Sequence, residues 1–180
     1  MMVEAVLEAG RLAPYAGLAN KGTRDFRRFF AVSASSAVVA PIRGLVRQAV
    51  AAKLDGLSES KDPRMLPMLG AMRGIAENGP PPWTAPWLLI VAERRGYPAR
   101  ESEALAHCLE NMWLKATALG LGFQMVSALA DLSGDIELSR LLGLPAGEFE
   151  FDACQVGFPE APLPDVAREE PESSITWFEG

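Results

Sequence analysis

The strongest constraint on the fold is an unbroken apolar run, APWLLIVA, at residues 85–92. The proline-rich segment ENGPPPWTAP leads into this run, and the charged residues Glu93 and Arg94 follow it. A short apolar run that does not alternate with polar residues is typical of a strand buried on both faces of a sheet. Such a strand needs cover on both sides, so the chain is expected to form layers of helices around a sheet.

Apolar spacing, capping residues and turn residues predict the other elements. Helices are predicted at residues 3–12, from Pro41 to about residue 50, and at 65–74 and 101–119, and strands at 26–34, 123–129 and 148–159. A further helix is predicted to run through Leu142 after an N-cap offered by Ser133-Gly134-Asp135. Gly120 and Gly122 are expected to end the long helix, because glycine readily adopts the positive φ of a helix C-cap. The segment ITWF at residues 175–178 is predicted to be an edge strand.

The order of these elements indicates an α+β fold with mixed α/β layers. No internal boundary stands out, so residues 1–180 are predicted to form a single domain, with residues 160–180 as an extended C-terminal tail. The composition agrees with a globular chain, because 49% of the residues are hydrophobic and 22% are charged.

Charge and hydropathy exclude some classes of partner. The formal net charge of −6 argues against nucleic acid, because phosphate binding needs a basic face. No apolar run approaches the roughly 20 residues that span a bilayer, so no membrane partner is expected. The start of the chain lacks the features of a signal peptide, and the sequence therefore predicts a soluble, cytoplasmic protein.

The usual catalytic and metal-binding patterns are missing. Cys108 and Cys154 have neither disulfide-framework nor zinc-ligand spacing, so no metal site is expected. The single histidine, His107, stands in mid-helix beside Glu103 and Glu110, and no GxSxG motif accompanies it. His107 is therefore interpreted as a surface or interface residue.

A basic cluster, KGTRDFRR at residues 21–28, is the sharpest local charge feature. It has two interpretations. The cluster is either a solvated loop that enters a strand, or an anion or phosphate site in which arginine forks match phosphate oxygens. On a strand, Arg27 and Arg28 would point to opposite faces, so at most one of them could face a site.

Several motifs in order resemble the nitroreductase superfamily of flavin enzymes. They are VLEAGRLAPYAG (6–17), the run at 85–92, HCLENMWLKATALGLGF (107–123) and LLGLPAGEFEFDACQVGFP (141–159). The family pattern has an APS-type turn, an apolar strand, a central helix that ends in GLG, an LGLP segment and a strand that ends in GYP. The resemblance implies a nitroreductase-like fold with a central, mostly antiparallel sheet and a long central helix.

The resemblance also implies a function. The family binds FMN at the interface of a homodimer and passes electrons from NAD(P)H to a small organic acceptor of nitroaromatic or quinone type. Because the flavin carries the chemistry, no catalytic side chain is expected. An alternative is a nitroreductase-fold dimer that has lost catalysis and serves as a flavin-binding or interaction module.

The segment after the glycines is the expected ring site. By family position, Met125, Val126, Ser127 and Ala128 face the isoalloxazine ring, where backbone N–H groups would stabilise negative charge on the reduced flavin. The small side chains of Ser127 and Ala128 would allow close approach of the ring. The competing interpretation is that FQMVSAL (123–129) is only a core strand.

Further site residues follow from the same resemblance. Pro14 and Tyr15 match the APS-type turn and are expected to bind the cofactor. The match departs where Leu18 stands at the family's asparagine position, and where the family's arginine segment ahead of the first helix finds no counterpart. We therefore expect Arg168 to be the main contact of the FMN phosphate, assisted by Arg24.

Overall fold

The computed structural model describes residues 2–15, 26–57, 62–81, 83–161 and 175–178. Within these residues, a four-stranded antiparallel sheet has the spatial order β1-β2-β4-β3. The strands are β1 (Arg27–Ser33), β2 (Trp87–Arg94), β3 (Gly122–Met125) and β4 (Phe149–Gly157). The helices are α1 (Met2–Arg11), α2 (Val39–Leu57), α3 (Leu66–Asn78), α4 (Glu101–Ala118) and α5 (Ile136–Leu141), with 3-10 helices η1 (Pro63–Met65) and η2 (Ser127–Leu132). This mixed α/β arrangement confirms the predicted fold class.

Strand β2 is buried on both faces, as its continuous apolar run predicts. Leu88, Ile90 and Ala92 enter one hydrophobic cluster, whereas Leu89 and Val91 enter the other. None of the five is more than 3% exposed. The alternation places one core layer on each side of the sheet.

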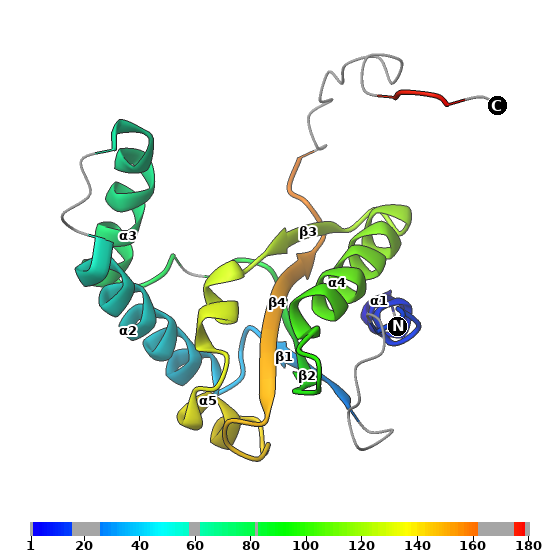
Figure 1. The fold of residues 1–180 in the computed structure, drawn as a ribbon, viewed down its shortest axis with the longest axis horizontal. Coiled ribbons are helices and arrows are strands. Elements are labelled where there is room, and N and C mark those ends of the chain that lie inside the picture. The colour runs from blue at the N-terminus through cyan, green and yellow to red at the C-terminus, as the bar shows by residue number, and fades with distance from the viewer. Residues whose placement is uncertain (1, 16–25, 58–61, 82, 162–174, 179–180) are drawn as a thin grey trace.

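Helices cover both faces of the sheet (Figure 1). Helices α1 and α4 lie on one side, and α2, α3 and α5 lie on the other. Helix α4 turns Leu105, Leu109 and Met112 inward, which confirms the predicted long amphipathic helix. Helix α1 crosses it closely, since a Cβ on Gly10 would lie 2.8 Å from the Met112 sulfur.

The two glycines that follow α4, Gly120 and Gly122, have different backbone conformations. Gly120 has a φ of 69° and follows the helix, as predicted. Gly122 was wrongly expected to share this conformation. It does not have a positive φ, because it is already the first residue of β3, opposite Gly157.

The predicted strand at residues 123–129 is too long. Strand β3 ends at Met125, and η2 begins at Ser127. The Val126 N–H still donates to the Ala153 carbonyl at 2.8 Å, and the chain then turns. The turn carries Leu129 and Leu132 into the core, where both are at most 4% exposed, and this burial outweighs the strand preference of the local sequence.

One other predicted boundary is confirmed, and one predicted element is corrected. Helix α5 begins at Ile136, and the Asp135 side chain caps it by accepting from the Leu138 N–H at 2.7 Å, which confirms the N-cap predicted within Ser133-Gly134-Asp135. Residues 175–178 form no strand, and Trp177 and Phe178 are 77% and 94% exposed. These residues pair with none of the four described strands.

Candidate functional site

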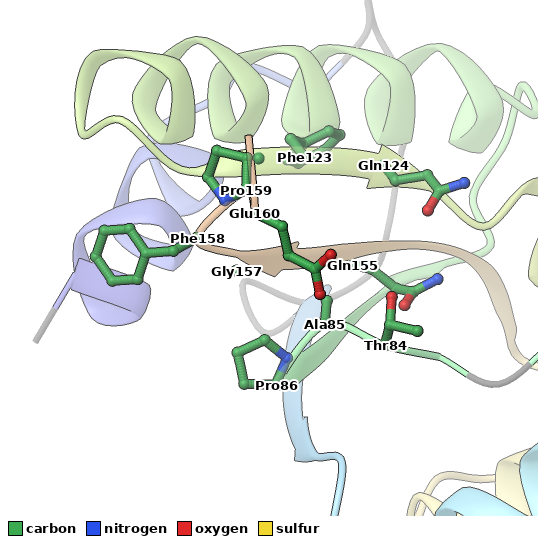
Figure 2. A pocket seen from close by; sticks show the side chains of 11 residues that line it. Thr84, Ala85, Pro86, Phe123, Gln124, Gln155, Gly157, Phe158, Pro159 and Glu160 are labelled. Atoms are coloured by element: carbon green, nitrogen blue, oxygen red, sulfur yellow. The ribbon is translucent and has the colours of Figure 1, made fainter. Parts of the chain in front are cut away.

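A groove lies at the end of the sheet where β4 finishes and β2 begins. It consists of two adjoining cavities of about 420 and 460 Å³, which share Thr84, Gln124 and Gln155. We call the larger one the η2 cavity and the smaller one the β4-end cavity. Figure 2 shows the β4-end cavity, with Phe123 and Gln124 above β4 and Thr84 to Pro86 below it.

The η2 cavity brings together four residues expected at the ring site: Met125, Val126, Ser127 and Ala128. The remaining described lining comes from α2, α3 and the proline-rich connector, and consists of Val46, Ile75, Pro80, Pro81 and Trp83 besides the three shared residues. None of these described lining residues has a side chain that is charged at neutral pH. The cavity therefore favours an uncharged, largely apolar ligand.

The first residues of η2, which line this cavity, carry N–H groups without a partner in the helix. The first backbone bond of η2 runs from the Leu129 N–H to the Val126 carbonyl at 2.9 Å, and no side chain caps the helix. The N–H groups of Ser127 and Ala128 lie ahead of that bond and have no acceptor within the helix.

Two arginines of α2 fix the connector wall of the η2 cavity. Arg43 donates to the Pro80 carbonyl. Arg47 donates through Nε to the Ala76 carbonyl and through Nη2 to the Glu77 carbonyl, both at 2.8 Å. These carbonyls belong to the last turn of α3 and the chain just after it, where cations are favourable. No sequence pattern had indicated this role, because the partners lie about 30 positions away along the chain.

Glycine is required at the corner of the β4-end cavity. A Cβ on Gly157 would lie 2.5 Å from the Pro86 Cδ, so a larger residue would push β4 away from the start of β2. Phe158, Pro159 and Glu160 continue from this corner and line the cavity.

Pro14 and Tyr15 do not meet this groove within one chain. The Tyr15 ring packs edge-on against Phe26, with centroids 5.0 Å apart. Phe26 precedes β1, whose Arg27 pairs with Glu93 near the far end of β2. That end is separated from Trp87 by nearly the whole strand, roughly 20 Å at about 3.3 Å per residue. Two further expected site residues, Arg24 and Arg168, lie outside the described residues.

Arg27 of the basic cluster has a structural role that neither interpretation anticipated. Its Nε donates to Glu93 Oε2 at 2.7 Å, and the two side chains are 7% and 0% exposed. Its Nη1 also donates to the carbonyls of Gly10 at 3.2 Å and Ala13 at 2.9 Å. Arg27 therefore joins β1, β2 and the C-terminal end of α1, and is neither solvated nor directed at the groove. Arg28, its neighbour, is exposed, as strand alternation predicts.

Cysteine and histidine supply no catalytic group at the groove. Burial raises the pKa of Cys108 to about 12, and burial also raises the pKa of Cys154, so both thiols stay protonated at neutral pH. His107 is exposed on α4, as predicted. Among the described residues, no three His, Cys, Asp or Glu side chains are grouped to hold a metal, and no helix is long and apolar enough to cross a bilayer.

Comparison with models of protein families shows to which family the chain belongs. Residues 1–158 match the family model described as the Nitroreductase family. The chain belongs to the Nitroreductase family. The match includes the whole described sheet and both cavities up to Phe158, and it confirms the family inferred from the motifs.

Solved structures share the fold. A nitroreductase with bound FMN from Bacteroides fragilis aligns with a TM-score of 0.69 at 23% identity, covering 99% of this chain and 87% of that one. A BluB-like flavoprotein from Clostridium difficile aligns with a TM-score of 0.67 at 17% identity, covering 99% and 88%. A nitroreductase with bound FMN from Desulfitobacterium hafniense has a TM-score of 0.59 at 19% identity, covering 99% and 86%. A search of curated proteins found no match.

The buried ion pair generates a stability prediction. Arg27→Met should lower the free energy of unfolding by about 3–5 kcal/mol, because it leaves the Glu93 carboxylate buried without its guanidinium. The double replacement of Arg27 by Met and Glu93 by Leu should recover most of this loss. Chemical denaturation monitored by circular dichroism measures the difference. Arg11→Met is the matched control, since Arg11 pairs with Glu8 on the exposed face of α1 and should matter little. Equal stability of the Arg27 and Arg11 variants would contradict the prediction.

Proposed function

We propose that this chain is an FMN-dependent oxidoreductase that passes electrons from NAD(P)H to a small organic acceptor of nitroaromatic or quinone type. The observation that carries the proposal is the η2 cavity, which is bounded by Met125 to Ala128 in a chain of the Nitroreductase family. Relatives of the same fold from Bacteroides fragilis and Desulfitobacterium hafniense have bound FMN. Another, NfnB, is described as dependent on FMN and NADPH.

The residues of the η2 cavity fit an isoalloxazine ring. Oxidised isoalloxazine is uncharged and planar, and the described lining of this cavity is likewise uncharged. When bound, the flavin supplies the exchange of hydride and electrons. The N–H groups of Ser127 and Ala128 would stabilise the negative charge of the reduced ring, while Pro80, Pro81 and Trp83 would keep water away from it.

A homodimer is part of the proposal. Pro14 and Tyr15 are expected at the cofactor, yet in one chain they lie at the opposite end of β2 from the groove. A second copy, arranged about a two-fold axis, could bring its own Pro14 and Tyr15 to this groove. The exposed apolar side chains of Trp177 and Phe178 also favour association.

Assembly can be measured directly. Analytical ultracentrifugation of the full chain at micromolar concentration should give the mass of a dimer, both with and without FMN. The reason is that a site built from opposite ends of two copies cannot form in a monomer. A stable monomer under both conditions would contradict the dimer.

The ring position generates a steric prediction. Ala128→Trp should abolish retention of FMN, because close approach of the ring to the η2 backbone leaves no room for an indole. The measurement is flavin absorbance per protein after gel filtration, with thermal unfolding to check the fold. Ala52→Trp, on the exposed face of α2, is the control and should keep its flavin. Normal flavin content in the Ala128 variant would place the ring elsewhere.

Substitution of two arginines tests which residues bind the phosphate of FMN. Arg168→Ala and Arg24→Ala should each weaken FMN binding, by roughly ten- to hundredfold for the main contact, because a charge-assisted hydrogen bond is lost. Titration with riboflavin, which lacks the phosphate, should show no such loss. If neither variant separates FMN from riboflavin, both residues are excluded as phosphate contacts.

The same purified protein separates the catalytic proposal from its alternative. Oxidation of NAD(P)H in the presence of quinone or nitroaromatic acceptors supports the oxidoreductase. Retention of flavin without such turnover would instead favour the flavin-binding or interaction module.

A further inference from the structure

Two glutamines stand directly opposite each other where the two cavities join. Gln124 on β3 is the cross-strand partner of Gln155 on β4, and both side chains line both cavities. Figure 2 shows the two carboxamides extending toward the same side of the strands, with Thr84 near Gln155. Gln155 is half-buried, whereas Gln124 is exposed in the groove.

These carboxamides are available to a ligand. In the part of the chain that the structure describes, neither one makes a hydrogen bond to another protein group. Each offers both donors and an acceptor without carrying charge. Besides these carboxamides, the described side chains of the η2 cavity include the hydroxyls of Thr84 and Ser127. Polar groups of this kind usually set the orientation of a ligand.

We infer that Gln124 and Gln155 form a recognition pair for the amide or imide edge of a heteroaromatic ligand. A ring edge of this kind presents carbonyl oxygens beside an N–H group, or a carbonyl beside an amino group. Two adjacent carboxamides can donate to the carbonyls and accept from the N–H. The inference rests on the proposed function and names the residues that orient a ligand there.

Two ligands of that function carry this chemistry. The pyrimidinedione edge of the flavin is a cyclic imide, and the nicotinamide of the electron donor carries a carboxamide. The shared feature is an uncharged amide edge, and separate measurements on the same variants distinguish the two sources. If the two glutamines on β3 and β4 were merely solvated, their substitution would affect the binding of neither ligand.

The test uses Gln124→Met and Gln155→Met, because methionine keeps the length of the side chain and removes the amide. Gln48→Met, on the exposed face of α2, is the matched control. Thermal unfolding of each full-length variant checks that the fold is retained. The first probe is lumiflavin against 3-methyllumiflavin, in which the imide N–H is blocked and phosphate plays no part.

The parent protein should bind lumiflavin more tightly than 3-methyllumiflavin, by roughly two- to tenfold, as expected for one neutral hydrogen bond. This preference should vanish in at least one of the two glutamine variants and persist in the Gln48 variant. The second measurement is the KM for NADH of the FMN-loaded proteins. A rise in KM with unchanged lumiflavin preference would assign the pair to the nicotinamide.

The inference is overturned if the parent binds flavin and oxidises NADH while both glutamine variants match it in lumiflavin preference and in KM. The proposed function would still stand in that case. A parent protein that binds neither lumiflavin nor FMN would instead overturn the proposed function, and the inference with it.

Discussion

The burial of β2 on both faces is the constraint on which the rest of the structure depends. A strand without a polar face must be covered twice, so α1 and α4 occupy one side and α2, α5 and η2 the other. The same burial isolates Glu93 near the end of the strand, where a carboxylate without a partner would be costly. Arg27 meets this requirement and at the same time holds the carbonyls at the end of α1. The burial of β2 thus determines the helix layers on both faces of the sheet. Through Arg27 it also positions the end of α1, which leads to Pro14.

The groove arises where this layered packing stops. Strand β3 is short because Leu129 and Leu132 are buried in the core, and the resulting turn places Ser127 and Ala128 in the lining of the η2 cavity. The opposite wall is a proline-rich connector, which cannot supply its own regular hydrogen bonds. Arg43 and Arg47 hold the chain at its start, so an irregular segment becomes a defined surface.

The chemical groups that line the groove explain why it lacks an evident set of catalytic side chains among the described residues. Its described polar groups are backbone donors, two carboxamides, hydroxyls and the Glu160 carboxylate at one end. Such a set positions and stabilises a bound group but does not perform redox chemistry by itself. A protein that relies on a flavin needs this arrangement, in which the cofactor reacts and the protein supplies shape and electrostatics. The separation of Pro14 and Tyr15 from the groove is the reason why we propose a site shared between two copies of the chain.

Part of the fold could be predicted from the sequence, because the residues that indicate it lie close together in the chain. The run at residues 85–92, the apolar face of α4 and the turn at Gly120 each depend on residues a few positions apart, and all three were predicted correctly. The family could be inferred from motifs in order, and the proposal that Met125 to Ala128 face a cofactor follows from that family. The early end of β3, the buried partner of Arg27 and the opposition of Gln124 and Gln155 could not. Arg27 and Glu93 are 66 positions apart, and the two glutamines meet through strand register alone. Only the tertiary structure decides such pairs, because the free energy of burial that selects them is shared among segments that are distant in the chain.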